Sequence, residues 1–305
     1  MTTCHQIGFS PKDVLRRAVA LSETGHSWNA DELNALQDAA TRVLSLDRRD
    51  WFLSLNQILV SRFPAHGLRF LENVGVLAFL LPEVPLLKDF HRSSAHHHKD
   101  VYEHTLQVVC QAVPRANVRW AALLHDIGKL HTRSFTEDGQ VHFFKHDEVG
   151  AYLCDGIFHR LGFPTVMADR IRTLVLLHLR PGLYTPKWSD NAVKRLMREA
   201  GDSMPDLLAL ARADNTTKRM TKRLANLRNV KALAQRCTSI RSRSRDDVAR
   251  LPRGLGNAIK HHFDLGQGPQ VGRMVDLCHQ GVRDGKLAPD APVGVHIEFL
   301  RNELR

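Results

Sequence analysis

Residues 121–131 read AALLHDIGKLH, an apolar run that leads directly into His125 and Asp126. The apolar spacing is typical of a buried helix, and Gly128 is the predicted helix terminator. Consecutive side chains project about 100° apart around a helix, so both reach one cation only if it lies against the helix end. Taken alone, the pair predicts either a cation site or an ordinary hydrogen-bonded pair at the end of a helix.

Further histidines and an aspartate occur in similar settings on both sides of this pair. His104 lies near the start of an amphipathic helix in DVYEHTLQVV, while His146, His178 and Asp214 occur in FFKHDEVGA, LVLLHLRPG and LALARADNT. Each borders an apolar stripe, where a polar group without a partner costs about 1–3 kcal/mol. Shared coordination of a metal ion satisfies them together, so we expect these helices to meet at one site.

Apolar spacing is helical along nearly the whole chain, and no convincing alternating strand pattern occurs, which predicts an all-α protein. The segment before residue 90 predicts helices that break at Pro64 and close at Pro82 and Pro85. We expect a helical N-terminal region over 1–90, a multi-helix domain with the candidate site over 91–240, and a smaller helical subdomain over 241–305.

The composition is that of an ordinary globular protein, with 305 residues, 43% of them hydrophobic and 25% charged. Five cysteines without a Cys-x-x-Cys pair argue against both a disulfide framework and a thiolate zinc site. No apolar run approaches the ~18 residues of a membrane helix, and the N-terminus lacks the features of a signal peptide. We therefore expect a cytoplasmic protein with no membrane partner.

Positive charge is concentrated in one stretch of the chain. Between residues 212 and 245 there are eleven basic residues and a single acid, Asp214. This stretch therefore accounts for nearly the whole net charge of +11. A solvated helical face usually mixes charge signs, so this stretch favours binding of a nucleic acid or nucleotide phosphate. The basic residues nearest Asp214 on its C-terminal side are the predicted contacts: Lys218, Arg219, Lys222 and Arg223.

The ordered set His, His-Asp, His, His, Asp resembles the HD-domain superfamily of metal-dependent phosphohydrolases. YEHTLQVV, RWAALLHDIGK, FFKHDEVGA and LLHL resemble the HD domain that follows the nucleotidyltransferase head in some bacterial CCA-adding enzymes. GLRFLENVGVLAFLLPEV resembles their neck and body, and LGQGPQVGRMVDLCHQGVRDGKL their tail, so the likeness covers roughly residues 31–305. The sequence contains neither the Gly-Gly loop nor the Asp-x-Asp pair of such a head, so CCA addition by this chain alone is not expected.

The resemblance implies four ligands for one divalent cation: His104, His125, Asp126 and Asp214. His146 and His178 then hold a second cation or contact a phosphate, and the sequence leaves both alternatives open. Imidazole and carboxylate ligands favour Mn²⁺, Ni²⁺, Co²⁺ or Fe²⁺, with Mg²⁺ a further candidate. We expect Asp126 to orient the attacking water and Lys129 to offset negative charge that develops at phosphorus.

The resemblance further implies a phosphohydrolase that acts on nucleotides or on RNA 3′ ends, with 2′,3′-cyclic phosphodiesterase, 2′-nucleotidase or phosphatase activity. The alternative is a non-catalytic RNA-binding or tRNA-binding module that partners a separate nucleotidyltransferase. All six motif positions are intact, which favours the enzyme.

Four further features have less specific interpretations. The histidines of AHHHKD, His96 to His98, are solvated, bind a metal or form part of the rim of the site. Trp188 is a candidate contact for a ligand. His131 and Arg133 are either phosphate contacts or residues of a solvated turn. The apolar residues around the His-Asp pair are expected in the core: Trp120, Leu123, Leu124 and Ile127.

Overall fold

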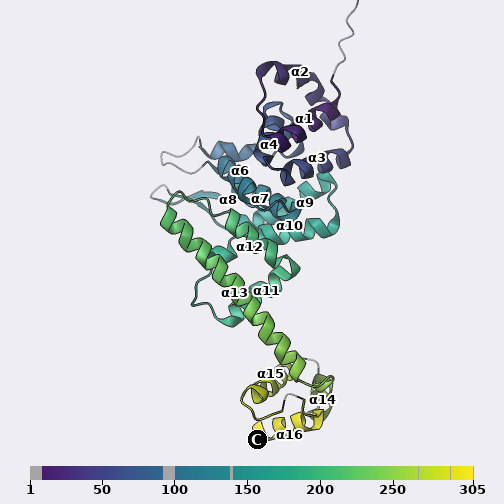
Figure 1. Ribbon diagram of the computed structural model, residues 1–305, viewed down its shortest axis with the longest axis vertical. Helices are drawn as coiled ribbons and strands as arrows, with labels where there is room; N and C mark the ends of the chain where they lie inside the picture. Colours follow the sequence, from purple (N-terminus) through teal and green to yellow (C-terminus); the bar gives the residue numbers. More distant parts are fainter. Residues whose placement is uncertain (1–8, 92–99, 138–139, 267, 289, 305) are drawn as a thin grey trace, which may run out of the picture. The chain divides into compact units, whose positions relative to one another are not determined.

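Helices are the dominant secondary structure of the described residues, which confirms the predicted all-α class. The structure, a computed structural model, describes these residues: 9–91, 100–137, 140–266, 268–288 and 290–304. It divides into two compact units, residues 1–234 and residues 235–305 (Figure 1). The division of the chain into three domains with boundaries at residues 90 and 240 stays a prediction.

The N-terminal helices pack on one another, most of them against α1. They are α1 (Pro11–Thr24), α2 (Ala30–Thr41), α3 (Arg48–Val60), α4 (Pro64–Asn73) and α5 (Val76–Leu80), with 3-10 turns η1 (Val43–Ser45) and η2 (Pro85–His91). The Asn29 side chain caps α2 and the Asp47 side chain caps α3, each by accepting a backbone N–H of the first turn. Pro64 starts α4, as a proline in the first helical turn can. A further break, which the sequence analysis missed, occurs at Gly75, whose φ of 79° favours glycine.

The central helices follow in the same unit. They are α6 (Val101–Gln111), α7 (Ala116–Leu124), α8 (Lys129–Thr132), α9 (His146–Leu161), α10 (Thr165–Leu177), α11 (Asp190–Ala200) and α12 (Met204–Ala213), with 3-10 turns η3 (Arg180–Leu183) and η4 (Gly201–Ser203). Helix α7 packs against α3, α6, α10 and α12, and so lies at the centre of this unit. Its apolar residues Trp120, Leu123 and Leu124, and Ile127 just beyond it, are fully buried, which confirms their predicted place in the core.

A short antiparallel hairpin connects α8 to α9. Its strands are β1 (Arg133–Phe135) and β2 (Val141–Phe143), with Arg133 paired to Phe143 and Phe135 to Val141. Neither strand is predicted from the sequence, because three residues are too few to show an alternating pattern. The hairpin delivers the chain to His146, the first residue of α9.

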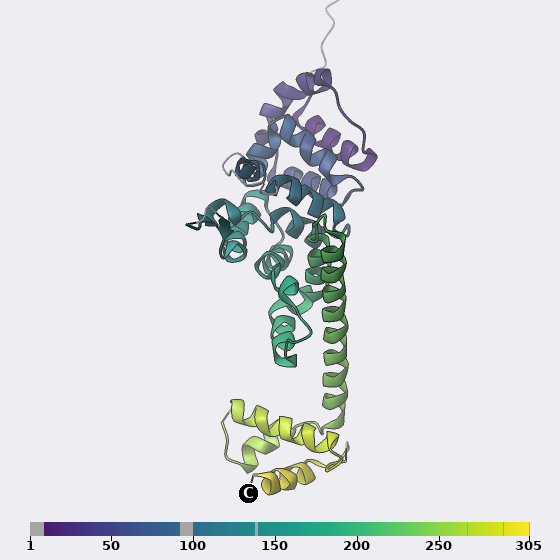
Figure 2. The same cartoon turned by 90° about the vertical axis from the view of Figure 1, so that its left-hand side faces the viewer.

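The second unit has its own small core. Helix α13 (Met220–Arg250) begins in the first unit and ends in the second, and is followed by α14 (Leu255–His262), α15 (Pro269–Arg283) and α16 (Val293–Glu303). The last three helices pack on one another through buried residues that include Ile259, Cys278 and Leu300 (Figure 2). Within the described residues, no helix is long and apolar enough to cross a membrane.

Candidate metal centre

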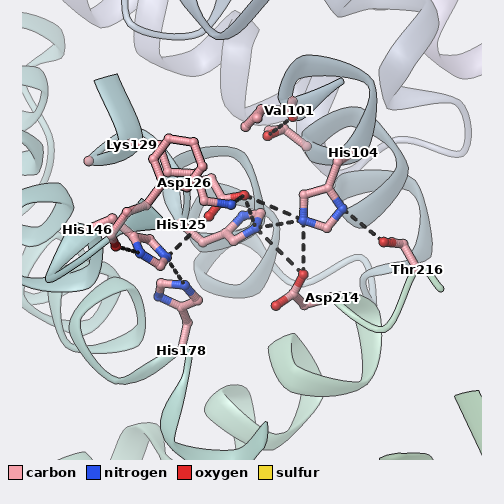
Figure 3. Close-up of polar contacts among 12 residues, drawn as sticks. Val101, His104, His125, Asp126, Lys129, His146, His178, Asp214 and Thr216 are labelled. Carbon is pink, nitrogen blue, oxygen red and sulfur yellow. Dashed lines mark hydrogen bonds and ion pairs between the residues drawn. The ribbon is translucent and has the colours of Figure 1, made fainter. Parts of the chain in front are cut away.

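Three helices of the first unit end at the same place. His125 is the C-terminal cap of α7, His178 that of α10 and Asp214 that of α12, and these helices pack against one another. Figure 3 shows the three side chains converging. The C-terminus of a helix carries a partial negative charge, so three converging ends favour a cation before any carboxylate is counted.

Two of these helices orient their histidines in the same way. Helices α7 and α10 both end in Leu-Leu, followed by the cap histidine. His125 Nδ1 lies 2.8 Å from the Ala122 carbonyl oxygen, and His178 Nδ1 lies 2.7 Å from that of Val175. Carbonyls in the last turn of a helix have no amide partner within it and can only accept, so each Nδ1 donates. In the neutral imidazole, each Nε2 is therefore left with its lone pair toward the centre.

One side of the centre is formed by two imidazoles and a carboxylate. His146 Nδ1 lies 2.8 Å from the Phe143 carbonyl oxygen, which leaves its Nε2 for the centre. That Nε2 lies 3.2 Å from His178 Nε2 and 3.5 Å from Asp126 Oδ1. Two Nε2 lone pairs that face each other at this distance repel unless a proton or a cation lies between them.

The other side of the centre has the same composition plus a second carboxylate. His104 Nε2 lies 3.3 Å from His125 Nε2, 3.5 Å from Asp126 Oδ2 and 3.1 Å from Asp214 Oδ1. His104 is oriented differently from the other three histidines, because its Nδ1 lies 2.9 Å from the Thr216 hydroxyl. His125 Nε2 also lies 3.3 Å from Asp126 Oδ2.

Asp126 belongs to both sides. Its Oδ2 faces His104 and His125 while its Oδ1 faces His146, and two groups of possible ligand atoms, each within 4.8 Å, share this carboxylate. The side chain is 2% exposed, and Lys129 Nζ lies 2.7 Å from Oδ2. The adjacent His-Asp pair thus places an imidazole on one side and a carboxylate between the two sides.

The ionisation of these groups favours one positive charge held between the carboxylates. Burial opposes charging of His125, but the Asp126 and Asp214 carboxylates outweigh it and raise the pKa of His125 to about 9. Burial also tends to raise the pKa of Asp126, yet His125 and Lys129 hold that pKa well below its usual value. Burial and the charge of His125 lower the pKa of His178 to about 4, so this imidazole is neutral at pH 7.

The residues present fit a divalent cation. The donors are imidazole nitrogens and carboxylate oxygens whose histidines are held by hydrogen bonds on the opposite ring nitrogen. This mixture suits Mn²⁺, Fe²⁺, Co²⁺ or Ni²⁺, and carboxylate oxygens also suit Mg²⁺. A cation between facing Nε2 atoms removes their repulsion.

Gly128 has a different role from the predicted one. Helix α7 ends at Leu124, and Gly128 has a φ of −63°, so its backbone does not need glycine to terminate a helix. A Cβ at this position would lie 2.0 Å from the His146 carbonyl oxygen and 2.5 Å from the Gly150 amide nitrogen. Glycine is required because the backbone beside Asp126 packs directly on the first turn of α9.

A cleft of about 720 Å³ adjoins one side of the centre. His104 and Asp214 lie among its lining residues, together with Lys218 and Lys222 from the predicted nucleic-acid contacts. The structure separates these from the other two predicted contacts. Arg223 instead lines a second hollow of about 370 Å³, and Arg219 lines neither.

The remaining predicted residues lie outside these contacts. His131 is exposed, the Arg133 guanidinium lies 4.8 Å from the centre of the Phe135 ring, and Trp188 packs against Tyr184 with ring centres 5.7 Å apart. His96 to His98 lie outside the described residues. Thr216 is not predicted from the sequence, in which its place two residues after Asp214 is its one signal.

Comparisons with known proteins identify the domain that carries this centre. The family model of the HD domain matches residues 101–219, a range that includes every predicted ligand. The CC-adding tRNA nucleotidyltransferase of Thermus thermophilus is 32% identical over 239 residues, 76% of this chain and 52% of that protein. The A-adding tRNA nucleotidyltransferase of Deinococcus radiodurans is 30% identical over 229 residues, which are 72% of this chain and 51% of that protein. The chain therefore spans about half the length of these two relatives.

Proposed function

The chain carries an HD domain at residues 101–219 and is related over about three quarters of its length to CC-adding and A-adding tRNA nucleotidyltransferases. On this premise we propose that it is a metal-dependent phosphohydrolase acting on nucleotides or RNA ends. One observation carries the proposal: the Asp126 carboxylate is shared between two groups of imidazoles, beside a cleft that is lined by two lysines.

The side chains of the centre have separate tasks in this chemistry. A bound divalent cation polarises a phosphoryl oxygen and lowers the pKa of water. Asp126 accepts a hydrogen bond from the attacking water and orients it toward phosphorus. Lys129 Nζ, 2.7 Å from Asp126, places a positive charge where negative charge develops in the transition state. Lys218 and Lys222 attract the phosphate into the cleft from the side of Asp214.

The basic residues beyond the cleft support an RNA substrate. Lys222 lines the cleft while its neighbour Arg223 lines the second hollow together with Arg212, so positive charge continues past the cleft. A mononucleotide needs only the first of these, whereas a strand places further phosphates along the second. We therefore propose RNA ends, including those of tRNA, as the substrate class, and hydrolysis of 2′,3′-cyclic, 2′- or terminal phosphates in the cytoplasm as the activity.

A hydrolysis screen tests the proposal. Purified protein is incubated with Mn²⁺, Co²⁺, Ni²⁺, Fe²⁺ or Mg²⁺ and with 2′,3′-cyclic nucleotides, 2′-nucleotides or bis(p-nitrophenyl) phosphate. We expect chelator-sensitive turnover that Asp126→Asn lowers by about 100-fold or more, because even residues that only orient ligands are worth about 10–100-fold. The matched control is Asp155→Asn, a similar change at an exposed aspartate paired with Arg172.

The outcomes separate the proposal from its alternative. Full activity in Asp126→Asn rules out this centre as the active site. Salt-dependent RNA binding without turnover under any metal instead supports a non-catalytic RNA-binding module that partners a separate nucleotidyltransferase, the function class favoured by the basic stretch alone.

A further inference from the structure

Hydrogen bonds fix the orientation of two asparagine amides beside the candidate metal centre. Asn215 Nδ2 donates to the Arg223 carbonyl oxygen at 2.9 Å, and Asn226 Nδ2 donates to Asn215 Oδ1 at 3.4 Å. A backbone carbonyl only accepts, so it determines which end of the Asn215 amide faces it, and Asn215 Oδ1 in turn orients the Asn226 amide. Among the described residues, no donor is bonded to Asn226 Oδ1, which remains an acceptor.

Asn226 lies on the wall of the cleft that also reaches His104 and Asp214. Lys222, Asn226 and Asn229 follow at i, i+4 and i+7 on α13, and all three line the cleft, so one stripe of the helix carries a cation and two amides. The rest of the lining includes small or apolar residues of other segments, among them Pro181, Gly182 and Ala211. A volume of about 720 Å³ is within the range of small-ligand sites.

This arrangement suits a nucleotide rather than a bare phosphate. The lysines are suited to a phosphate, which a cation held at His104 and Asp214 would also attract. Pro181, Gly182 and Ala211 leave space for a flat ring against α13. The oriented oxygen of Asn226 can accept a hydrogen bond from a donor on a ligand in the cleft. Adenine and cytosine offer an exocyclic amino group, whereas uracil offers a carbonyl oxygen at the corresponding position, which repels another acceptor.

We propose that this cleft reads the base of the nucleotide whose phosphate is hydrolysed, and that Asn226, positioned by Asn215, determines a preference for adenine or cytosine over uracil. The phosphate part of this inference rests on the proposed function. The base part rests on the chain of hydrogen bonds from the Arg223 carbonyl to Asn226 and on their shared place in the cleft.

Turnover of three cyclic nucleotides tests the inference. The value of kcat/KM is measured for 2′,3′-cyclic AMP, CMP and UMP with the wild type, Asn226→Ala and Asn215→Ala, and with Asn191→Ala as control at an exposed asparagine on α11. We expect the wild type to favour AMP and CMP about three- to tenfold, the value of one net hydrogen bond. Asn226→Ala should bring the three values together, because AMP and CMP lose a hydrogen bond while UMP loses a repulsive contact.

The orienting residue gives a second, independent readout. Asn215→Ala frees the Asn226 amide to rotate, so the base preference should disappear while UMP turnover persists. A merely structural role would lower turnover of all three substrates together. Equal turnover of the three substrates by the wild type, or an unchanged preference in Asn226→Ala, overturns the inference.

Binding measurements distinguish this failure from failure of the proposed function. Calorimetric titrations with 3′-AMP and 3′-UMP need no hydrolysis. One outcome is that nothing is hydrolysed, but 3′-AMP binds more tightly than 3′-UMP and Asn226→Ala removes this difference. The inferred base preference is then correct and the proposed hydrolase activity is wrong. If Asp126-dependent hydrolysis is indifferent to the base, the hydrolase stands and base reading is wrong.

Discussion

At the scale of single residues, Thr216 shows how a side chain outside the centre orients one within it. Its hydroxyl lies 2.9 Å from His104 Nδ1 and takes the place of the backbone carbonyl that orients each of the other three histidines. We expect Thr216→Val to weaken Mn²⁺ binding about tenfold or more, the usual effect of losing such a partner, and Thr216→Ser to preserve it. Isothermal titration measures both.

The control for this prediction is Thr173→Val, which removes a hydroxyl that donates to the Asp169 carbonyl within α10, away from the centre. Equal Mn²⁺ affinity in Thr216→Val and Thr173→Val would show that the hydroxyl does not orient His104.

The proton on His125 predicts a pH dependence of cation binding. The pKa of His125 is raised to about 9, so below this pH a cation must displace a proton, whereas Asp126 is already ionised. We expect apparent affinity for Mn²⁺ to rise about tenfold per pH unit between pH 6.5 and 8.5 and to level off above pH 9. Chelator competition at several pH values measures the slope, and a flat profile would show that no proton is displaced.

Much of the centre was predictable from the sequence because its chemistry forces polar residues into apolar helices. His104, His125, Asp126, His146 and the other predicted ligands interrupt or border apolar stripes, and the structure brings them together. What the sequence could not show is how each is oriented. A hydrogen bond to a backbone carbonyl cannot be recognised in an amino-acid sequence. In the sequence, Thr216 and Asn215 look like ordinary residues of a polar loop, and only the structure shows which side chains they orient.

At the scale of elements, the contact between the Asp126 segment and α9 predicts a large effect of one methyl group. Gly128→Ala places a Cβ against the His146 carbonyl and the Gly150 amide, where backbone cannot move aside without moving α9. We expect a loss of at least about 1–3 kcal/mol in the free energy of unfolding, together with weaker cation binding. Urea unfolding followed by circular dichroism, and Mn²⁺ titration, measure the two effects.

Gly156→Ala is the matched control, because it lies on α9 with no other atom near its Cβ position. It should stabilise the protein by up to about 1 kcal/mol through helix propensity. Similar unfolding curves for the two variants would contradict the close approach at Gly128.

The elements differ in how far the sequence determined them. Helices with long apolar stripes, such as α7, were predictable from spacing, and prolines marked the starts or ends of others. The hairpin was missed because its three-residue strands are defined by pairing with each other rather than by local pattern. Gly128 was assigned the commonest role of a glycine after a helix, while its true constraint comes from His146, distant in sequence.

At the scale of the whole molecule, the basic stretch predicts how RNA binding responds to salt. Arg219 and Arg223 lie outside the cleft lining, so Arg219→Gln with Arg223→Gln should weaken RNA binding while mononucleotide turnover stays within a few-fold. Each phosphate contact on a single strand contributes about 0.7 to the slope of log affinity against log salt, so the double change reduces it by up to about 1.4. Filter binding at several salt concentrations measures the slope.

The control pair Arg170→Gln with Lys194→Gln removes the same charge from exposed positions outside the basic stretch. An equal change of slope in both double variants would mean that only net charge matters. Lost mononucleotide turnover in the Arg219 and Arg223 variant would instead place these side chains at the active site.

The convergence of three helix ends also determines where the chain tolerates changes of length. Ligands at the C-termini of α7, α10 and α12 move by about 1.5 Å and turn by about 100° when one residue is inserted in the turn that carries them. A residue added where any of these helices begins extends it away from the centre and leaves the ligands in place. Insertions and deletions that preserve the centre are thus confined, for these three helices, to their starts and to the loops before them.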